Sequence, residues 1–95
     1  NGWVPHTSGY PLMYNKDELG VVRFVNRIAN GAYQSLICIL PEGYRPKYNI
    51  YLAVFGYDGG HEVAFVKIYA NGEVHHAGGT TAEISLDNIA YQAEQ

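Results

Sequence analysis

The side chains best suited to chemistry gather in the short stretch "YDGGH" (57–61). Saccharide recognition uses aromatic ring faces against sugar C–H surfaces and a few fixed polar groups for the hydroxyls. Tyr57 supplies such a ring, and Asp58 and His61 supply polar partners within the same five residues. We therefore expect these three residues to form the core of a ligand site, with His75 as the nearest neighbour from the next hairpin.

Three further residues have the same kind of chemistry but also a plain packing interpretation. Trp3 and Tyr69 could each provide an aromatic ring on which a sugar stacks. For Trp3, packing against the core is an equally good interpretation. Arg45 could clamp a phosphate or a carboxylate. It belongs to "LPEGYRP" (40–46), which two prolines and a glycine make stiff, so it could equally brace the fold.

Catalytic or metal chemistry has weaker support in the sequence. The possible ligands or acid–base groups are His6, His61, His75, His76, Asp58 and Glu62. Adjacent His75 and His76 point to opposite faces of a strand, so they are poorly placed to share one ion, and His76 is expected to be buried and hydrogen-bonded. No metalloprotease, paired-cysteine, serine-nucleophile or phosphate-loop motif occurs. We expect no catalysis, no metal and no cofactor, with Cys38 a buried structural thiol.

Size and charge limit the possible partners. The 95 residues suit a single domain over 1–95, and the net charge of −3 provides no basic stripe for nucleic acid. No apolar run has the length of a membrane span. Charge is uneven: residues 1–47 hold five basic and three acidic side chains, whereas residues 48–95 hold one basic and six acidic.

A two-residue alternation of apolar side chains predicts strands rather than helices. Two stretches, "SLICIL" (35–40) and "NIYLAVF" (49–55), are apolar on both faces. In "SLICIL", Leu36, Cys38 and Leu40 should share one face and Ile37 and Ile39 the other. A lone small sandwich leaves one face of most strands wet, so these two stretches need a second covering surface, which another protomer could supply.

The stretch "FVKIYANGEV" (65–74) predicts a hairpin. A three-residue loop over 70–72, with Gly72 in the left-handed conformation, would pair Ile68 with Val74 and place both inside the fold. Turn signals recur along the whole chain at the spacing found in short-stranded sandwiches and barrels. The expected fold is therefore all-β, a small antiparallel β-sandwich or barrel of about six to eight strands, similar to a jelly roll.

The order of motifs resembles the C-terminal head domains of phage tail-fibre and baseplate receptor-binding proteins, of the type found in phages of Gram-positive bacteria. The features that carry the resemblance are an early Trp (Trp3), a "GVV" strand, the "LP-x-GYRP" turn, the "V-x-I-x-x-NG-x-V" hairpin and a closing "SLDNI-x-Y". Many such domains carry a glycine just after the first core strand, where this chain has Asn26, so that corner departs from the pattern.

This resemblance implies a non-catalytic head that assembles as a homotrimer at the tail tip or baseplate of a virion. Its partners would be a host cell-wall saccharide and other phage tail proteins, and the chain would be the C-terminal fragment of a longer fibre protein. Two alternatives stay open: a structural module that trimerises or caps a fibre, and a small polysaccharide hydrolase. Neither nucleic-acid binding nor membrane insertion is implied.

Overall fold

The computed structural model describes residues 2–5 and 11–93, and all the regular structure in these ranges is β. The strands are β1 (Val4–Pro5), β2 (Met13–Lys16), β3 (Val21–Val25), β4 (Arg27–Ala29), β5 (Leu36–Ile39), β6 (Ile50–Tyr57), β7 (His61–Ile68), β8 (Glu73–Gly79), β9 (Glu83–Ser85) and β10 (Ala90–Gln92). The predicted all-β class is confirmed, but the described ranges hold ten strands rather than six to eight.

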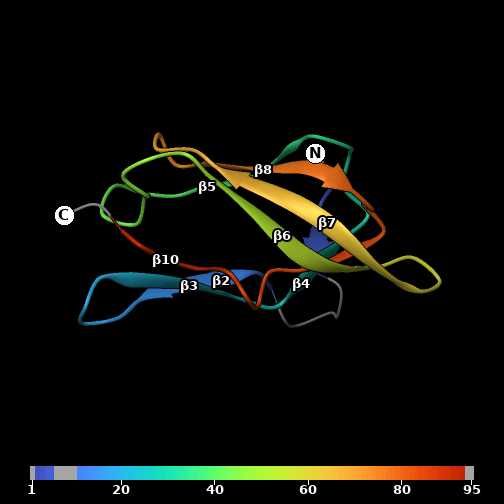
Figure 1. The fold of residues 1–95 in the computed structure, drawn as a ribbon, viewed down its shortest axis with the longest axis horizontal. Coiled ribbons are helices and arrows are strands. Elements are labelled where there is room, and N and C mark those ends of the chain that lie inside the picture. Colours follow the sequence, from blue (N-terminus) through green and yellow to red (C-terminus); the bar gives the residue numbers. More distant parts are fainter. Residues whose placement is uncertain (1, 6–10, 94–95) are drawn as a thin grey trace.

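The strands form two antiparallel sheets of unequal size. The larger has seven strands in the order β1-β4-β9-β6-β7-β8-β5, and the smaller has three in the order β10-β3-β2. Figure 1 shows β2, β3 and β10 grouped as one layer below the long strands β6 and β7. The predicted antiparallel sandwich is confirmed in this form.

The run "VVRFVNRI" explains part of the higher strand count, because Asn26 divides it between the two sheets. Asn26 has a φ of 84°, a left-handed conformation that asparagine tolerates better than most residues. Its side chain donates to the Pro11 carbonyl at 2.7 Å, and its backbone N–H donates to the Asp87 carboxylate. The chain therefore leaves β3 in one sheet and enters β4 in the other within a single residue.

The core lies between the two sheets. Its fully enclosed members come from both layers and include Val22, Phe24, Leu40, Val54, Val66, Ile68, Val74, Ile84, Leu86 and Ile89. In β7 and β8 these buried residues alternate with exposed or half-buried ones. The large sheet thus turns one face to the core and the other outward.

The β7–β8 hairpin has the predicted register. Ile68 pairs with Val74, the Tyr69 N–H donates to the Glu73 carbonyl at 2.9 Å, and Gly72 has a φ of 97°. Upstream, β6 and β7 pair without interruption from Ile50–Ile68 to Tyr57–His61. These registers fix which side chains share the outer face of the sheet.

The predicted alternation in β5 is wrong for Ile37. The pairing of β5 with β8 shifts between Leu36 and Cys38, and Ile37 and Cys38 both pack against the core. A bulge places an extra residue in one strand and so breaks the two-residue alternation. Ile39 is exposed, so it does not share a face with Ile37 as the alternation predicted.

The stiff turn over 40–46 packs against the β7–β8 hairpin. The Leu40 N–H donates to the Gly72 carbonyl at 2.8 Å, and Arg45 Nε donates to the Leu40 carbonyl at 3.0 Å. A Cβ at position 72 would lie 2.5 Å from the Leu40 oxygen, so this contact requires glycine. Tyr44 and Tyr91 pack against the core, and the Tyr91 hydroxyl donates to the Tyr44 carbonyl at 2.6 Å.

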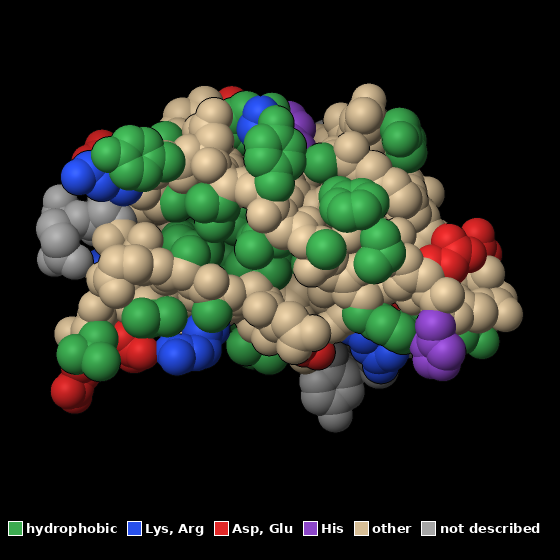
Figure 2. All heavy atoms as spheres, viewed as in Figure 1, with side chains coloured by type: hydrophobic (Ala, Val, Ile, Leu, Met, Phe, Trp, Pro, Cys, Tyr) green, Lys and Arg blue, Asp and Glu red, His purple; other side chains and the backbone are tan. Residues whose placement is uncertain are grey.

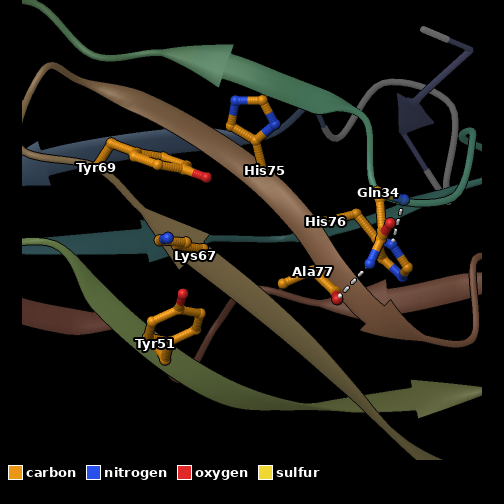
Figure 3. A pocket seen from close by; sticks show the side chains of 7 residues that line it. All are labelled: Gln34, Tyr51, Lys67, Tyr69, His75, His76 and Ala77. Carbon is orange, nitrogen blue, oxygen red and sulfur yellow. Dashed lines mark hydrogen bonds between the residues drawn. The ribbon is translucent and has the colours of Figure 1, made fainter.

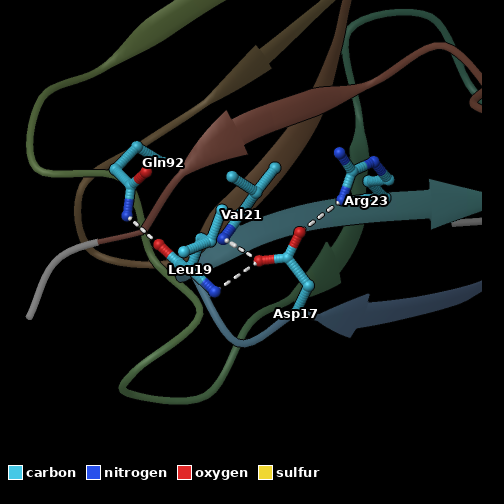
Figure 4. A network of polar contacts seen from close by, with 5 residues as sticks. All are labelled: Asp17, Leu19, Val21, Arg23 and Gln92. Atoms are coloured by element: carbon cyan, nitrogen blue, oxygen red, sulfur yellow. Dashed lines mark hydrogen bonds and ion pairs between the residues drawn. The ribbon is translucent and has the colours of Figure 1, made fainter.

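The β2–β3 turn is held by one carboxylate. Asp17 accepts hydrogen bonds from the backbone N–H groups of Leu19 and Val21 at 2.9 and 3.0 Å and from Arg23 at 2.8 Å (Figure 4). The hydrogen bond from Arg23, followed by that from Val21, lowers the pKa of Asp17. Gln92 of β10 donates to the Leu19 carbonyl at 2.9 Å, so the turn also anchors the last strand.

Candidate functional site

A groove of about 350 Å³ lies on the outer face of the large sheet. Its residues come from β6, β7, β8 and the segment before β5: Gln34, Tyr51, Lys67, Tyr69, His75, His76 and Ala77. Tyr51 and His75 are the direct cross-strand partners of Lys67 on its two sides. We call this site the lysine groove, and Figure 3 shows its lining side chains.

Lys67 occupies the middle of the groove, between two tyrosines. Its ammonium lies 4.6 Å from the ring centroid of Tyr51 and 4.4 Å from that of Tyr69, distances suited to cation–π attraction. Figure 3 shows both phenol oxygens on the side of the ammonium. The Tyr51 hydroxyl as a hydrogen-bond partner, reinforced by that of Tyr69 and opposed by desolvation, raises the pKa of Lys67. The lysine is therefore charged at neutral pH.

Beneath the groove, on the inner face of β8, lies a fixed imidazole. His76 is buried, its Nδ1 accepts a hydrogen bond from the Gln34 N–H at 3.0 Å, and its Nε2 lies 3.0 Å from the Thr80 carbonyl. Because a carbonyl oxygen can only accept, Nε2 carries the proton and the ring is the neutral Nε2–H form. The expectation that His76 is buried and hydrogen-bonded is confirmed.

Gln34 adopts an unusual backbone conformation at the margin of the groove. Its φ is 54°, which costs about 1–2 kcal/mol for a residue that carries a Cβ. The hydrogen bond to His76 holds it there, and its side-chain amide donates to the Ala77 carbonyl at 3.4 Å (Figure 3). Strained residues of this kind often accompany functional sites.

His75 forms the groove's other edge and is already hydrogen-bonded. Its Nε2 lies 2.9 Å from the Glu73 carboxylate, and its ring meets that of Tyr69 edge-on with centroids 5.1 Å apart. The ring is therefore fixed in place as an aromatic wall rather than free to rotate.

The predicted cluster "YDGGH" does come together, at the far end of the β6–β7 hairpin. Tyr57 and His61 are cross-strand partners with ring centroids 6.0 Å apart. Tyr57 and Asp58 line an open cleft of about 340 Å³. The prediction that His75 is a neighbour of this cluster is wrong. His75 pairs with Lys67, and Lys67 lies six residues from His61 along β7, a distance of about 20 Å at the usual strand rise.

Trp3 and Arg45 have structural contacts and line neither site. The Trp3 indole N–H donates to Ser35 Oγ at 2.9 Å, and its ring packs against the core and lies 5.6 Å from that of His76. A Cβ at Gly31 would lie 1.9 Å from this indole, so the backbone rests directly on the ring. Arg45 holds the turn over 40–46 through its hydrogen bond to Leu40.

Sequence reasoning missed Lys67, Tyr51 and Gln34. The hairpin register alone puts Lys67 opposite His75, and one more pairing puts it opposite Tyr51. A single lysine on a strand usually indicates only a solvated surface, which hides this signal. The position of Gln34 depends on a loop whose conformation no local pattern indicates.

The described residues contain no group of three or more His, Cys, Asp or Glu side chains placed to hold a metal ion. His6, one of the possible ligands, lies outside them. Burial raises the pKa of the Cys38 thiol to about 11, so it is protonated and a poor nucleophile at neutral pH. Within the same ranges no helix is long and apolar enough to cross a membrane.

By its fold and site, the protein is a small antiparallel β domain of two sheets with an aromatic groove on the outer face of the large sheet. No known family model, curated protein or solved structure matches it.

Proposed function

We propose that this domain is a non-catalytic adhesion module that binds a cell-surface saccharide through the lysine groove. The observation that carries the proposal is the convergence of Tyr51, Tyr69 and His75 around Lys67 in one solvent-open groove. Aromatic faces suit sugar C–H surfaces, and the phenol, ammonium and amide groups suit sugar hydroxyls. We assign these groups to binding a saccharide and not to cleaving it.

The apolar part of the outer face supports assembly with further copies of the same chain. Phe55, Val63 and Phe65 are 38%, 52% and 45% exposed, and with Ala53 they form two adjacent cross-strand pairs, Ala53–Phe65 and Phe55–Val63. Figure 2 shows hydrophobic side chains at the surface over the centre of this view, with charged ones mainly at its margins. Burying about 800 Å² per partner would be an ordinary interface, and a closed trimer would cover this patch on every copy.

Together with the sequence resemblance, these features favour a receptor-binding head at the tail tip or baseplate of a phage, a homotrimer joined to other tail proteins. Individually weak saccharide sites suffice there, because several copies on one particle multiply the binding. The second candidate is a capping or trimerisation module, which the apolar patch favours by itself. A capping module would assemble as a trimer and bind no saccharide.

The direct test is binding of the labelled chain to isolated Gram-positive cell walls. Tyr51→Ala should reduce binding at least about tenfold, because it removes one of the groove's ring faces. Tyr48→Ala is the matched control, since Tyr48 is equally exposed, at 72% against 70% for Tyr51, but lies outside the groove. Equal loss from both variants, or no binding by the unmodified chain, would refute saccharide adhesion through this site.

Two measurements on the same samples separate the other candidates. Solution mass should show a trimer, and Val63→Glu should convert it to a monomer by placing a charge in the apolar patch. A monomeric unmodified chain would refute the assembly. Release of soluble saccharide from the walls, lost on changing His61 or Asp58, would instead identify a hydrolase.

A further inference from the structure

The ammonium of Lys67 is surrounded by aromatic rings and neutral polar groups. No carboxylate among the described residues lies within ion-pair distance of it, whereas Arg23, Arg27 and His75 each have one. Lys67 is also the only Lys or Arg in residues 48–95, a half that carries six acidic side chains. The one positive charge of this half therefore lies in the groove with only aromatic and neutral polar neighbours.

The hydrogen-bond donors around Lys67 outnumber the acceptors. An ammonium has three N–H donors, and the two phenol oxygens of Tyr51 and Tyr69 can accept at most two of them. Each phenol also has its own O–H to donate. The Gln34 amide adds one N–H beyond its contact with Ala77 and also one acceptor oxygen. His75 Nδ1 is a further acceptor, because Nε2 holds its proton toward the Glu73 carboxylate. With these included, the donors still outnumber the acceptors. The groove thus presents an excess of donors around a positive charge.

The nearby acidic group does not satisfy this charge. Glu73 lies two residues before His75 on the same strand, β8, and its carboxylate is 2.9 Å from His75 Nε2 and 3.4 Å from Asn71 Nδ2. Glu73 is not among the residues that line the groove and makes no ion pair with Lys67. A ligand that enters between Tyr51 and Tyr69 therefore meets the ammonium first.

We propose that the lysine groove selects saccharides that carry an anionic group, a phosphate or a carboxylate, with that group bound between Tyr51 and Tyr69 against Lys67. Ionised oxygens accept hydrogen bonds without donating any, which complements the groove's excess of donors. The sugar ring or polyol beside the anion would then lie against the aromatic faces of Tyr69 and His75. This proposal names the ligand class for the adhesion role above and rests on it.

The experiment is an NMR titration of the ¹⁵N-labelled 95-residue chain with three probes: sn-glycerol 1-phosphate, D-glucuronate and D-glucose. We expect at least one anionic probe to bind roughly tenfold or more tightly than glucose, with shifts at Tyr51, Lys67 and Tyr69. Phosphate preference and carboxylate preference both support the proposal and identify the source of the anion. Equal binding of all three probes would overturn it.

Variants tie the preference to the groove. Lys67→Gln should remove the preference for the anion, and Tyr51→Phe, which keeps the ring and deletes the hydroxyl, should weaken anion binding several-fold. Lys47→Gln is the matched control, because the Lys47 ammonium also lies over a tyrosine ring, 5.6 Å from the centroid of Tyr48, outside the groove. Retention of anion preference in Lys67→Gln, or its loss in Lys47→Gln, would overturn the proposal.

The outcomes also separate this proposal from the adhesion role. If Tyr51→Ala abolishes cell-wall binding while Lys67→Gln leaves it intact, adhesion stands and anion selection fails. If the anionic probes bind through Lys67 but the chain binds no cell wall, the anion site stands and adhesion fails.

Discussion

The two faces of the β6–β7–β8 sheet are built from similar residues but have different surroundings. The inner face, with Val54, Val66 and Ile68, is almost fully enclosed by the core. The outer face, with Phe55 and Val63, is about half exposed. Both faces read as apolar in sequence, so hydrophobicity alone does not distinguish the core of a fold from a surface that binds something else.

The adjacent histidines show the same contrast at the level of single residues. His76 is enclosed, with both ring nitrogens bonded to backbone groups from separate segments. His75 is partly exposed, and its Nε2 contacts one partly exposed carboxylate, that of Glu73. One ring holds the fold together, whereas the other forms the wall of a groove.

The largest expected effect separates these two histidines. His76→Ala should lower the free energy of unfolding by about 3–4 kcal/mol, because it leaves a cavity and removes the partners of the Gln34 N–H and the Thr80 carbonyl. His75→Ala should cost less than about 1 kcal/mol, since only an exposed pair is lost. Urea unfolding of both variants tests this, and similar losses would show that the two faces are equally structural.

The two valines of β7 provide a second matched pair. Val66→Ala should cost about 2–3 kcal/mol, the transfer free energy of the deleted methyl groups plus a cavity term. Val63→Ala should cost below about 1 kcal/mol in dilute solution, because Val63 is already 52% exposed.

Protein concentration sharpens this second pair. If Val63 lies in an interface, the cost of Val63→Ala should rise with concentration, because association stabilises only the folded state. The cost of Val66→Ala arises within one chain and should change less. A Val63→Ala cost that stays constant up to millimolar protein would contradict the assembly.

Much of the fold could be predicted because it depends on local pattern. The β7–β8 hairpin followed from the need to place Ile68 and Val74 on one face, together with a glycine able to adopt a positive φ. The exposed outer face followed from apolar residues on both sides of "NIYLAVF". In both cases the two-residue period of a strand connects sequence to orientation directly.

The parts of the fold and site that could not be predicted depend on departures from the two-residue period of a strand or on contacts between distant residues. The β5 bulge moved Ile37 to the core, and Asn26 divided one apolar run between two sheets. In the candidate site, the cluster at 57–61 formed because it is local. The lysine groove needed the pairing of three strands plus a loop at Gln34, so the sequence indicated only His75 and Tyr69 among its members.

The smallest expected effect is at Gln34, which contacts the buried His76 and also lines the groove, so one substitution there changes both stability and binding. Gln34→Gly should raise the free energy of unfolding by roughly 0.5–1 kcal/mol. Glycine adopts a φ of 54° without strain, and this gain is larger than the loss caused by the greater entropy of glycine in the unfolded chain. The same change removes the side-chain amide from the groove while the backbone N–H to His76 is kept, so binding to cell walls should weaken. Gln34→Ala is the control, because it removes the amide and keeps the strain, and it should weaken binding without the gain in stability. If Gln34→Gly gained stability and bound cell walls as tightly as the unmodified chain, the strain at this residue would have no role in the groove, and the amide would have to be left out of the site.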